Sequence, residues 1–254
     1  MSLTVVTHHI GMPDEQRDLL SQWLPDIGKQ DVIEWVRMLG SSARWASSGC
    51  RLVLLTDNTT RIPDDLPWDV KRYHMAATPQ GVNHHRMYAR VKFCETAPPG
   101  EYIFCDADVL LNRIPEMSFD MGITLRFCGE EGGMKVQEGV MYCGNILAAK
   151  DYFSEILDRM VHGTEDERID WGGTQKAAAN MLFPLAVNGH KYRPNFMWRG
   201  WRFAMLPLLK YNWSPESDNA VPKKEAYAWH FKGDRKPMMA GYYEYLQQRR
   251  EMAA

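Results

Sequence analysis

Two aspartates separated by a single alanine follow an apolar stretch in the sequence EYIFCDADVLLN, at residues 101–112. Ionised carboxylates at the end of a buried strand are costly unless a positive group neutralises them. If the backbone stays extended, Asp106 and Asp108 point to the same side of the chain. Two oxygen ligands in this arrangement suit a hard cation such as Mg²⁺ or Mn²⁺. The same spacing is also typical of aspartates that cap a turn or pair with arginines, so the pair alone leaves both interpretations open.

A second group of candidate ligands lies far downstream, in AWHFKGDRKP at residues 228–237. His230 falls on a strand-like stretch, and Gly233 and Lys236 follow it. Imidazole is a good ligand for Mn²⁺ as well as for zinc. A glycine beside a lysine is a common way to approach phosphate oxygens closely. Taken alone, His230 is more simply a packed or surface histidine, so its interpretation depends on the groups around it.

Alternating strands and helices must position these groups. Apolar stretches and helical spacing predict strands at residues 3–9, 50–58 and 101–111, and helices at residues 30–49 and 83–100. This order is typical of βαβ units and a mainly parallel sheet. In open α/β sheets, ligands bind outside the carboxyl ends of the strands, so Thr7, Asp57 and the aspartate pair should share one edge.

The later part of the chain has a mixed pattern. It predicts strands at residues 122–129, 138–150 and 226–233, and helices at residues 151–163, 174–189 and 242–254. No internal repeat, low-complexity segment or linker divides the chain. We therefore expect one compact α/β domain over residues 1–254.

The composition is ordinary for a globular protein, with 45% hydrophobic and 24% charged residues among 254. A formal net charge of -2 gives no general basic field for nucleic acid or membranes. Five widely spaced cysteines without a CxxC pair favour a reducing compartment. The first residues lack a signal-peptide pattern, and no apolar run approaches the roughly 18 residues of a membrane helix. We expect a cytoplasmic protein without stable membrane insertion.

Several segments, taken in order, resemble the nucleotide-sugar glycosyltransferases of family 8, the glycogenin and lipopolysaccharide-galactosyltransferase group with the GT-A fold. YIFCDADVLLN resembles the family's strand and DxD motif, and HFKGDRKP resembles its late HxxGxxKP box. Between them, MYARVKF, YCGNIL, TQKAAANML and LPLLKYNW resemble four further family segments in the family's order. The similarity spans roughly residues 50–237. It implies an α/β, Rossmann-like, mainly parallel central sheet flanked by helices, with mixed strands in the C-terminal half.

The resemblance also implies a metal-dependent transfer of a sugar from a nucleotide-sugar. Asp106, Asp108 and His230 would hold Mn²⁺ or Mg²⁺ against the diphosphate of the donor, most simply a UDP-sugar. Further contacts to the donor are expected from Thr7, His8, Arg90, Ala107, Gly233 and Lys236. The family retains the anomeric configuration, and Asp170 and Gln175 are the candidates for catalytic roles at the sugar.

The same resemblance divides the single catalytic domain into three parts. Residues 1–110 would form a nucleotide-binding half ending in DxD, residues 111–237 a sugar and acceptor half, and residues 238–254 a C-terminal helix. The acceptor stays open between a saccharide, a protein and a nucleic-acid base. The segment NFMWRGWRFAMLP, at residues 195–207, is either an acceptor surface of aromatics and arginines or a surface loop.

Two departures and two alternatives limit this interpretation. Thr174 replaces the aspartate of the family's Asp-Gln pair, and Tyr142 and Cys143 replace its Asn and small residue. A phosphohydrolase of the haloacid dehalogenase type also ends a strand in DxD, with Asp106 as nucleophile and Asp108 as general acid. A non-catalytic nucleotide-sugar-binding protein of the same fold is the other alternative.

Overall fold

The computed structural model describes residues 2–11, 31–74, 81–125, 136–168, 172–188, 191–217 and 220–252. The strands are β1 (Leu3–His8), β2 (Arg51–Thr56), β3 (Asp69–Arg72), β4 (Glu101–Cys105), β5 (Val109–Leu111), β6 (Met121–Leu125), β7 (Val136–Cys143), β8 (Val187–Asn188), β9 (Lys191–Tyr192), β10 (Asn195–Trp198), β11 (Trp201–Pro207) and β12 (Ala228–His230). The helices are α2 (Val32–Ala46), α3 (Gly81–Thr96), α4 (Ile146–His162), α5 (Glu165–Arg168), α6 (Gly173–Ala186), α7 (Leu208–Tyr211), the 3₁₀ helix η2 (Gly233–Met238) and α8 (Met239–Glu251).

In the described part of the chain, eight strands form one sheet in the order β10-β11-β6-β7-β4-β1-β2-β3. Parallel pairing joins β1 to both β2 and β4, β2 to β3, and β11 to β6. Strand β7 runs antiparallel to β4 and β6, and β10 runs antiparallel to β11. The predicted α/β fold, with a mainly parallel sheet and mixed strands later in the chain, is confirmed.

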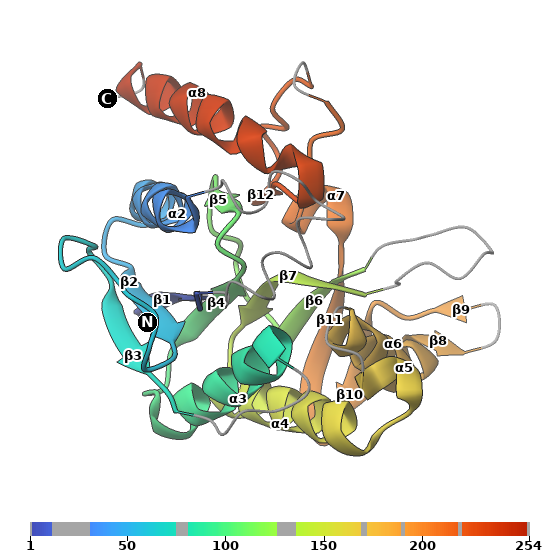
Figure 1. Cartoon of the computed structure of the whole chain (residues 1–254). Coiled ribbons are helices and arrows are strands. Elements are labelled where there is room, and N and C mark those ends of the chain that lie inside the picture. The colour runs from blue at the N-terminus through green and yellow to red at the C-terminus, as the bar shows by residue number, and fades with distance from the viewer. Residues whose placement is uncertain are drawn as a thin grey trace.

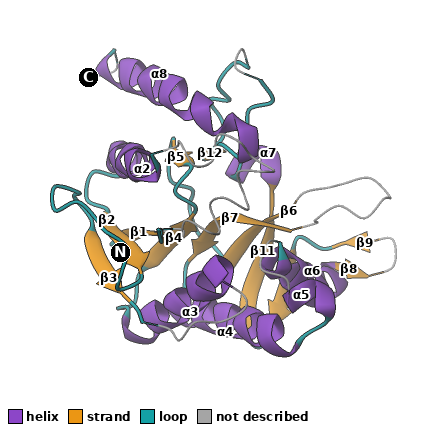
Figure 2. Ribbon diagram, viewed as in Figure 1, coloured by secondary structure: helices purple, strands orange, loops and turns teal. Residues whose placement is uncertain are grey.

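Helices cover both faces of this sheet (Figure 1, Figure 2). On one face, α3, α4 and α6 pack against side chains such as Phe104 of β4. On the other face, α2 packs against neighbours such as Ile103. Because β4 is buried on both faces, its sequence is a continuous apolar run rather than an alternating one. Helix α8 lies beyond α2 and closes a third, aromatic-rich core over β12.

The stretch at residues 101–111 was predicted as one strand, but it is two. Strand β4 ends at Cys105, the aspartate pair occupies a turn, and the chain then enters β5. Strand β5 leaves the main sheet and pairs antiparallel with β12, which places His230 beside Val109. The hydroxyl of Ser42 in α2 accepts a hydrogen bond from the Leu111 amide at 3.0 Å and so holds β5 above the sheet. This turn therefore brings the aspartate pair close to the segment that carries His230.

Strand β7 is shorter than predicted and α4 is longer. The prediction extended the strand to residue 150, but β7 ends at Cys143 and the helix begins at Ile146. Asn145 explains the difference, because its side chain accepts a hydrogen bond from the Leu147 amide at 3.1 Å and caps the helix. Ile146, Ala148 and Ala149 therefore face the core from a helix, whereas Leu147 is exposed.

The aromatic segment at residues 195–207 is a β-hairpin, not a loop. Its tip joins Trp198 to Trp201, and its second strand lies inside the main sheet. Phe203 pairs with Met121, Met121 lies opposite Cys143, and that cysteine lies opposite Tyr102 at the start of β4. The tip is therefore at the edge of the sheet opposite to the aspartate pair, and the acceptor surface expected there is remote from the DxD turn.

Candidate metal centre

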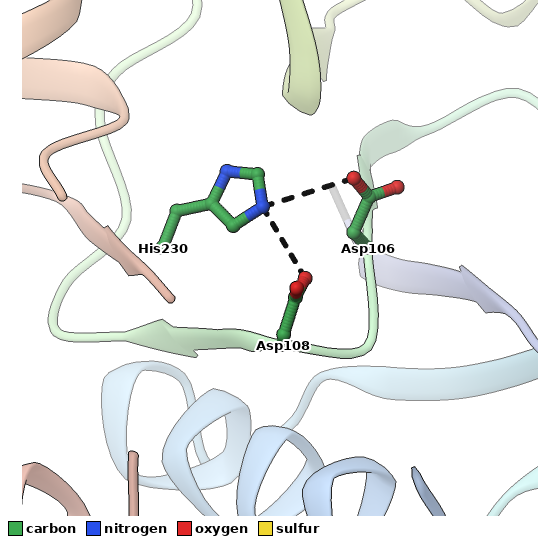
Figure 3. A group of neighbouring side chains, drawn as sticks. All are labelled: Asp106, Asp108 and His230. Carbon is green, nitrogen blue, oxygen red and sulfur yellow. Dashed lines mark ion pairs between the residues drawn. The ribbon is translucent and has the colours of Figure 1, made fainter. Parts of the chain in front are cut away.

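Three side chains from the two distant segments converge on one point (Figure 3). Nε2 of His230 lies 3.2 Å from Oδ1 of Asp108 and 3.8 Å from Oδ2 of Asp106. One ligand atom from each residue lies within 4.8 Å of the others. Asp108 and His230 are 7% and 3% exposed, so two of the three groups are almost fully removed from water. Two carboxylates and one imidazole are a donor set that suits Mn²⁺ and Mg²⁺ better than a sulfur-rich site would.

Backbone hydrogen bonds fix the main-chain segments that carry the three candidate ligands. The Phe231 amide donates to the Asp108 carbonyl at 2.9 Å, which ties the DxD turn to the end of β12. The Asp106 amide donates to the carbonyl of Gly139 in β7, also at 2.9 Å. The His230 amide donates to the Trp213 carbonyl at 2.7 Å. Each ligand is therefore positioned by its main chain, independently of a metal ion.

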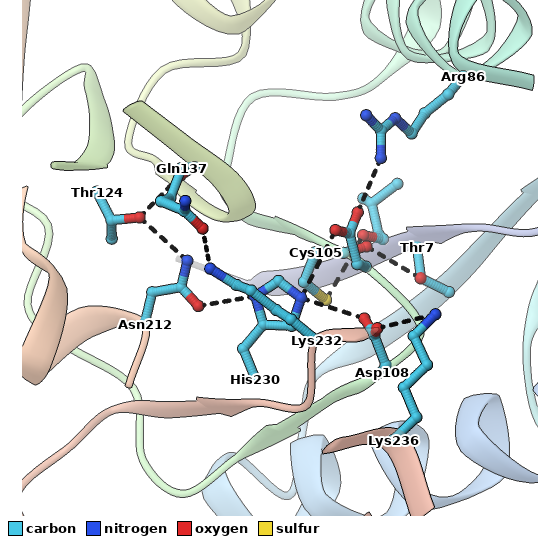
Figure 4. Close-up of polar contacts among 12 residues, drawn as sticks. Thr7, Arg86, Cys105, Asp108, Thr124, Gln137, Asn212, His230, Lys232 and Lys236 are labelled. Carbon is cyan, nitrogen blue, oxygen red and sulfur yellow. Dashed lines mark hydrogen bonds and ion pairs between the residues drawn. The ribbon is translucent and has the colours of Figure 1, made fainter. Parts of the chain in front are cut away.

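A chain of hydrogen bonds determines which nitrogen of His230 carries the proton (Figure 4). The carbonyl of Gln137 can only accept, so the Thr124 hydroxyl donates to it at 2.8 Å. The same hydroxyl then accepts from Nδ2 of Asn212 at 3.1 Å. This orients the amide so that its Oδ1 accepts from Nδ1 of His230 at 3.0 Å. Nδ1 is therefore protonated, and Nε2 faces the carboxylates.

This tautomer makes a positive charge between the three ligands necessary. A bare lone pair on Nε2 would face carboxylate oxygens at 3.2 Å and 3.8 Å, which is unfavourable. Either a proton on Nε2 or a metal ion satisfies all three groups. Burial alone would raise the pKa of Asp108, but His230 and Lys236 lower it to about 2, so this ligand is ionised at neutral pH. The residues present fit a divalent cation.

Three cationic side chains surround the two carboxylates. Nη1 of Arg86 lies 3.1 Å from Oδ1 of Asp106, and Nη2 of Arg90 lies 4.0 Å from the same oxygen. Nζ of Lys236 lies 3.4 Å from Oδ2 of Asp108 and packs over the ring of Trp35. Asp106 thus pairs with arginines and Asp108 with a lysine, and the same two aspartates form with His230 a cluster that could hold a metal ion, so the two interpretations of the sequence are compatible. Once a divalent ion is added, the site carries a net positive charge and is complementary to an anion.

The predicted donor-contact residues lie on the elements that frame the cluster. Thr7 is buried at the end of β1, and its hydroxyl donates to the Cys105 carbonyl at 3.0 Å. Ala107 lies in the DxD turn. Gly233 begins η2 with a φ of 58°, a left-handed conformation that favours glycine, and a Cβ there would meet no atom within 4 Å. Gly233 therefore exposes main chain beside Lys236.

The structure describes only one of the two predicted catalytic residues. Asp170 lies outside the described residues. Gln175 is on α6, and its Oε1 is buried without a hydrogen-bond partner among the described residues. In the segment at residues 142–147, which resembles a family segment, Cys143 pairs with Tyr102 at the opposite end of β4 from the aspartate pair. Because β7 is antiparallel to β4, the first half of β7 is the part that reaches the metal centre.

Three residues at the site were not identified as site residues from the sequence. A Cβ built on Gly139 would lie 1.9 Å from Cε1 of His230, so only glycine leaves room for the imidazole. An isolated glycine in an apolar strand often marks such a close approach, and this signal was present in QEGVMYC. Thr124 carries no comparable local signal. Asn212 lies in the family-like segment LPLLKYNW, but its role depends on pairing between distant segments.

Removing the hydrogen-bond acceptor behind His230 should weaken metal binding. In Asn212→Ala, nothing holds Nδ1, and the ring loses its orientation. Outer-shell partners of this kind are typically worth about 10- to 100-fold in metal affinity. In Asn212→Asp, a carboxylate oxygen can still accept from Nδ1, so the loss of affinity should be smaller than in Asn212→Ala. Titration of Mn²⁺ by calorimetry checks both values; equal affinities for the wild type and the alanine variant would contradict the proposed relay.

His8 belongs to a second polar group beside the metal centre. Its Nε2 lies 2.9 Å from Nδ1 of His85, whose other nitrogen lies 2.9 Å from the Tyr73 carbonyl. Burial, followed by His85 and the cations Arg86 and Arg90, lowers the pKa of His8 well below its ordinary value of 6.5. His8 is therefore neutral in the folded protein at neutral pH.

Replacing His8 by asparagine should flatten the pH dependence of stability. Below about pH 6.5, the unfolded chain binds a proton at this histidine and the folded chain does not, so stability falls as the pH falls. The contribution of His8 is about 1.4 kcal/mol for each pH unit below that value, until the folded-state pKa is reached. Urea unfolding at about pH 7.5 and about pH 5.5 measures the slope. An identical change in unfolding free energy for the wild type and the variant would refute this assignment.

Comparison with known proteins gives matches among solved structures. No family model and no curated protein matches the sequence. Among solved structures, the chain is similar to a glycosyltransferase involved in the glycosylation of the major capsid of PBCV-1, with 12% identity and a TM-score of 0.56. The match covers 96% of this chain and 100% of that one. The chain therefore shares the fold of that glycosyltransferase, and the similarity extends over nearly the whole of this chain and all of that one.

Proposed function

We propose that this protein is a metal-dependent glycosyltransferase that takes its sugar from a nucleoside diphosphate donor, most simply a UDP-sugar. The observation that carries the proposal is the cluster of Asp106, Asp108 and His230 at the carboxyl end of β4. In a sheet of this type, ligands bind at that edge. The glycosyltransferase fold and the resemblance of the DxD and HxxGxxKP segments to family 8 support the same conclusion.

The charge around the cluster supports a diphosphate as the group that binds. Arg86, Arg90 and Lys236 already neutralise the two carboxylates, so a bound divalent ion leaves an excess of positive charge. A diphosphate carries the negative charge that this excess requires. Mn²⁺ is the proposed ion because the ligand set includes an imidazole, and Mg²⁺ is the alternative.

The metal would supply Lewis-acid stabilisation of the charge that develops on the departing diphosphate. Asp106, Asp108 and His230 would hold the ion, and the Asn212 relay keeps the proton on Nδ1 so that Nε2 is free to act as a ligand. Lys236 lies beside Asp108 and can donate to a phosphate oxygen as the anomeric carbon–oxygen bond breaks. The positive φ of Gly233 lets the main chain approach the same phosphate without a side chain between them.

The finer assignments are parts of the same proposal. Thr7, His8, Arg90 and Ala107 would line the nucleotide-sugar, and transfer would retain the anomeric configuration. Asp170 and Gln175 are the proposed catalytic groups on the sugar side. One catalytic domain would comprise the nucleotide half at residues 1–110, the sugar and acceptor half at 111–237 and the C-terminal helix at 238–254.

Cytoplasmic localisation is also proposed. No helix in the described ranges combines the length and the apolar character that crossing a bilayer requires. The proposed acceptor is a saccharide, a protein or a nucleic-acid base.

A panel of nucleotide-sugars tests the proposed reaction. Each donor is incubated with the protein and Mn²⁺, and free nucleoside diphosphate is followed as the donor is slowly hydrolysed. We expect release from one or two donors, dependent on the metal. Hydrolysis of simple phosphate esters with a phosphorylated Asp106 would instead identify a phosphohydrolase. Tight donor binding without release, with every acceptor class supplied, would identify a non-catalytic binding protein.

A further inference from the structure

Glu138 presents a buried carboxylate with one unused oxygen beside the metal centre. The residue lies on β7 and is 1% exposed. Its Oε1 accepts a hydrogen bond from the Tyr152 hydroxyl at 2.6 Å. Its Oε2 is buried and has no hydrogen-bond partner among the described residues. Because buried carboxylate oxygens are almost always paired, this oxygen requires an explanation.

Arg90 presents the complementary unpaired donors. The side chain is 1% exposed, and neither Nη1 nor Nη2 has a hydrogen-bond partner in the described part of the chain. Its guanidinium packs over the ring of Phe153 at 5.3 Å. Burial, followed by the nearby Arg86, lowers the pKa of Arg90 to about 10, while Asp106 and Glu138 oppose this shift. Arg90 and Glu138 are thus electrostatic neighbours, yet among the described contacts no hydrogen bond joins them.

Both groups adjoin the metal ligands. The Glu138 side chain lies on the opposite face of β7 from Gly139 and the His230 ring, because successive side chains of a strand alternate, and it reaches the cluster through its electrostatic neighbour Arg90. Arg90 lies 4.0 Å from the Asp106 carboxylate. A sugar attached to a diphosphate at the metal would therefore be close to both unpaired groups.

The chemistry of the pair restricts the ligand group that it can take. The guanidinium can only donate, and the ionised carboxylate can only accept. A hydroxyl satisfies both, because its oxygen accepts from Arg90 while its proton is donated to Glu138. A phosphate or carboxylate oxygen without a proton would satisfy Arg90 but would be repelled by Glu138.

We propose that Glu138 and Arg90 together bind the hydroxyl on C6 of the donor sugar, and that Glu138 thereby selects a neutral hexose over a uronic acid, which carries a carboxylate at C6. This inference rests on the function proposed above and adds the substrate class. Glu138 is then a specificity-determining residue, and Tyr152 is a positioning residue that fixes the carboxylate through Oε1.

The test measures how much the sugar adds to nucleotide binding. Calorimetry with the full chain and Mn²⁺ gives affinities for UDP, UDP-glucose, UDP-galactose and UDP-glucuronate. We expect the wild type to bind one hexose donor more tightly than UDP and to bind UDP-glucuronate more weakly than that hexose donor. Loss of a hydrogen bond to a charged group corresponds to about 10- to 100-fold in affinity, so Glu138→Gln should reduce the gain from the sugar by that factor. The affinity for UDP itself should stay within about twofold, because UDP lacks the sugar.

Glu155→Gln is the control, since Glu155 is a partly buried carboxylate that pairs with Arg159 on α4 and Arg199 in the hairpin. It should leave every affinity unchanged. An equal sugar gain in the wild type and Glu138→Gln would overturn the inference, and so would wild-type binding of UDP-glucuronate as tight as that of the best hexose donor. The second comparison needs no variant, so it holds even if Glu138→Gln does not fold. Failure of UDP itself to bind with Mn²⁺ would remove the proposed function and this inference with it.

Discussion

Asp108→Asn is expected to abolish metal binding and sugar release while leaving the fold intact. Asparagine keeps the size of the side chain but removes the charge that faces His230 and Lys236. Since loss of an outer-shell partner costs about 10- to 100-fold in metal affinity, loss of this direct ligand should cost more than about 100-fold. Release of nucleoside diphosphate should fall by at least the same factor, because it depends on the bound ion. Calorimetric titration with Mn²⁺ and the donor assay measure the two effects.

The control for this variant is the same substitution at the far edge of the sheet. Asp120 accepts a hydrogen bond from the Arg202 amide at 2.8 Å, and an asparagine oxygen can accept the same bond. Asp120→Asn should therefore bind Mn²⁺ like the wild type. Undiminished Mn²⁺ affinity in Asp108→Asn would mean that the metal binds at another site, and would remove the basis of the proposed function.

Gly139→Ala should be as damaging to the metal centre, although it adds one methyl group and no charge. The new Cβ would lie 1.9 Å from Cε1 and 2.4 Å from Nδ1 of His230. Either the ring turns and loses its bond to Asn212, or β7 moves and loses the bond between its carbonyl and the Asp106 amide. Overpacking of this kind typically costs about 1–3 kcal/mol of stability. We expect Mn²⁺ affinity to fall by about 100-fold or more, because a ligand is displaced.

Gly241→Ala separates this local effect from a general effect of losing a glycine. Gly241 lies in α8, where an added Cβ would meet nothing within 4 Å. The control should bind Mn²⁺ normally and gain about 0.5–1 kcal/mol of stability, since alanine is the better helix former. Comparison of the free energies of unfolding and the Mn²⁺ affinities of the two variants checks the prediction. A Gly139→Ala protein that binds Mn²⁺ as the wild type does would show that His230 is not held where the structure places it.

The sequence was sufficient to predict the three candidate metal ligands but not the path of the chain through the site. The composition of β4 identified a buried strand that ends in two carboxylates. The expectation that both point the same way came from an extended backbone, whereas the structure forms a turn at residues 106–108 and begins a second small sheet. The carboxylates still converge, because β5 pairs with β12 and the Asp108 carbonyl bonds the Phe231 amide. Such pairing between distant segments leaves no periodic signal in either one.

The wrong predictions of strand and helix boundaries have local physical causes. The strand expected to continue to residue 150 stops at Cys143 because Asn145 caps a helix, and the apolar residues that follow fit both patterns. The hairpin at residues 195–207 was not predicted, because tryptophans and arginines occur both in surface loops and in strands and so give no clear pattern. The relay from Thr124 to Asn212 joins residues 88 positions apart, so only the folded chain shows it.

The most direct measurement is a crystal structure of the protein grown with Mn²⁺ and UDP, recorded for the anomalous scattering of manganese. The proposed function predicts one anomalous peak, from a manganese ion coordinated by Asp106, Asp108 and Nε2 of His230. Both phosphates of UDP should contact this ion, and Lys236 should lie beside them. A manganese peak away from these residues, or UDP bound without contact to the metal, would contradict it.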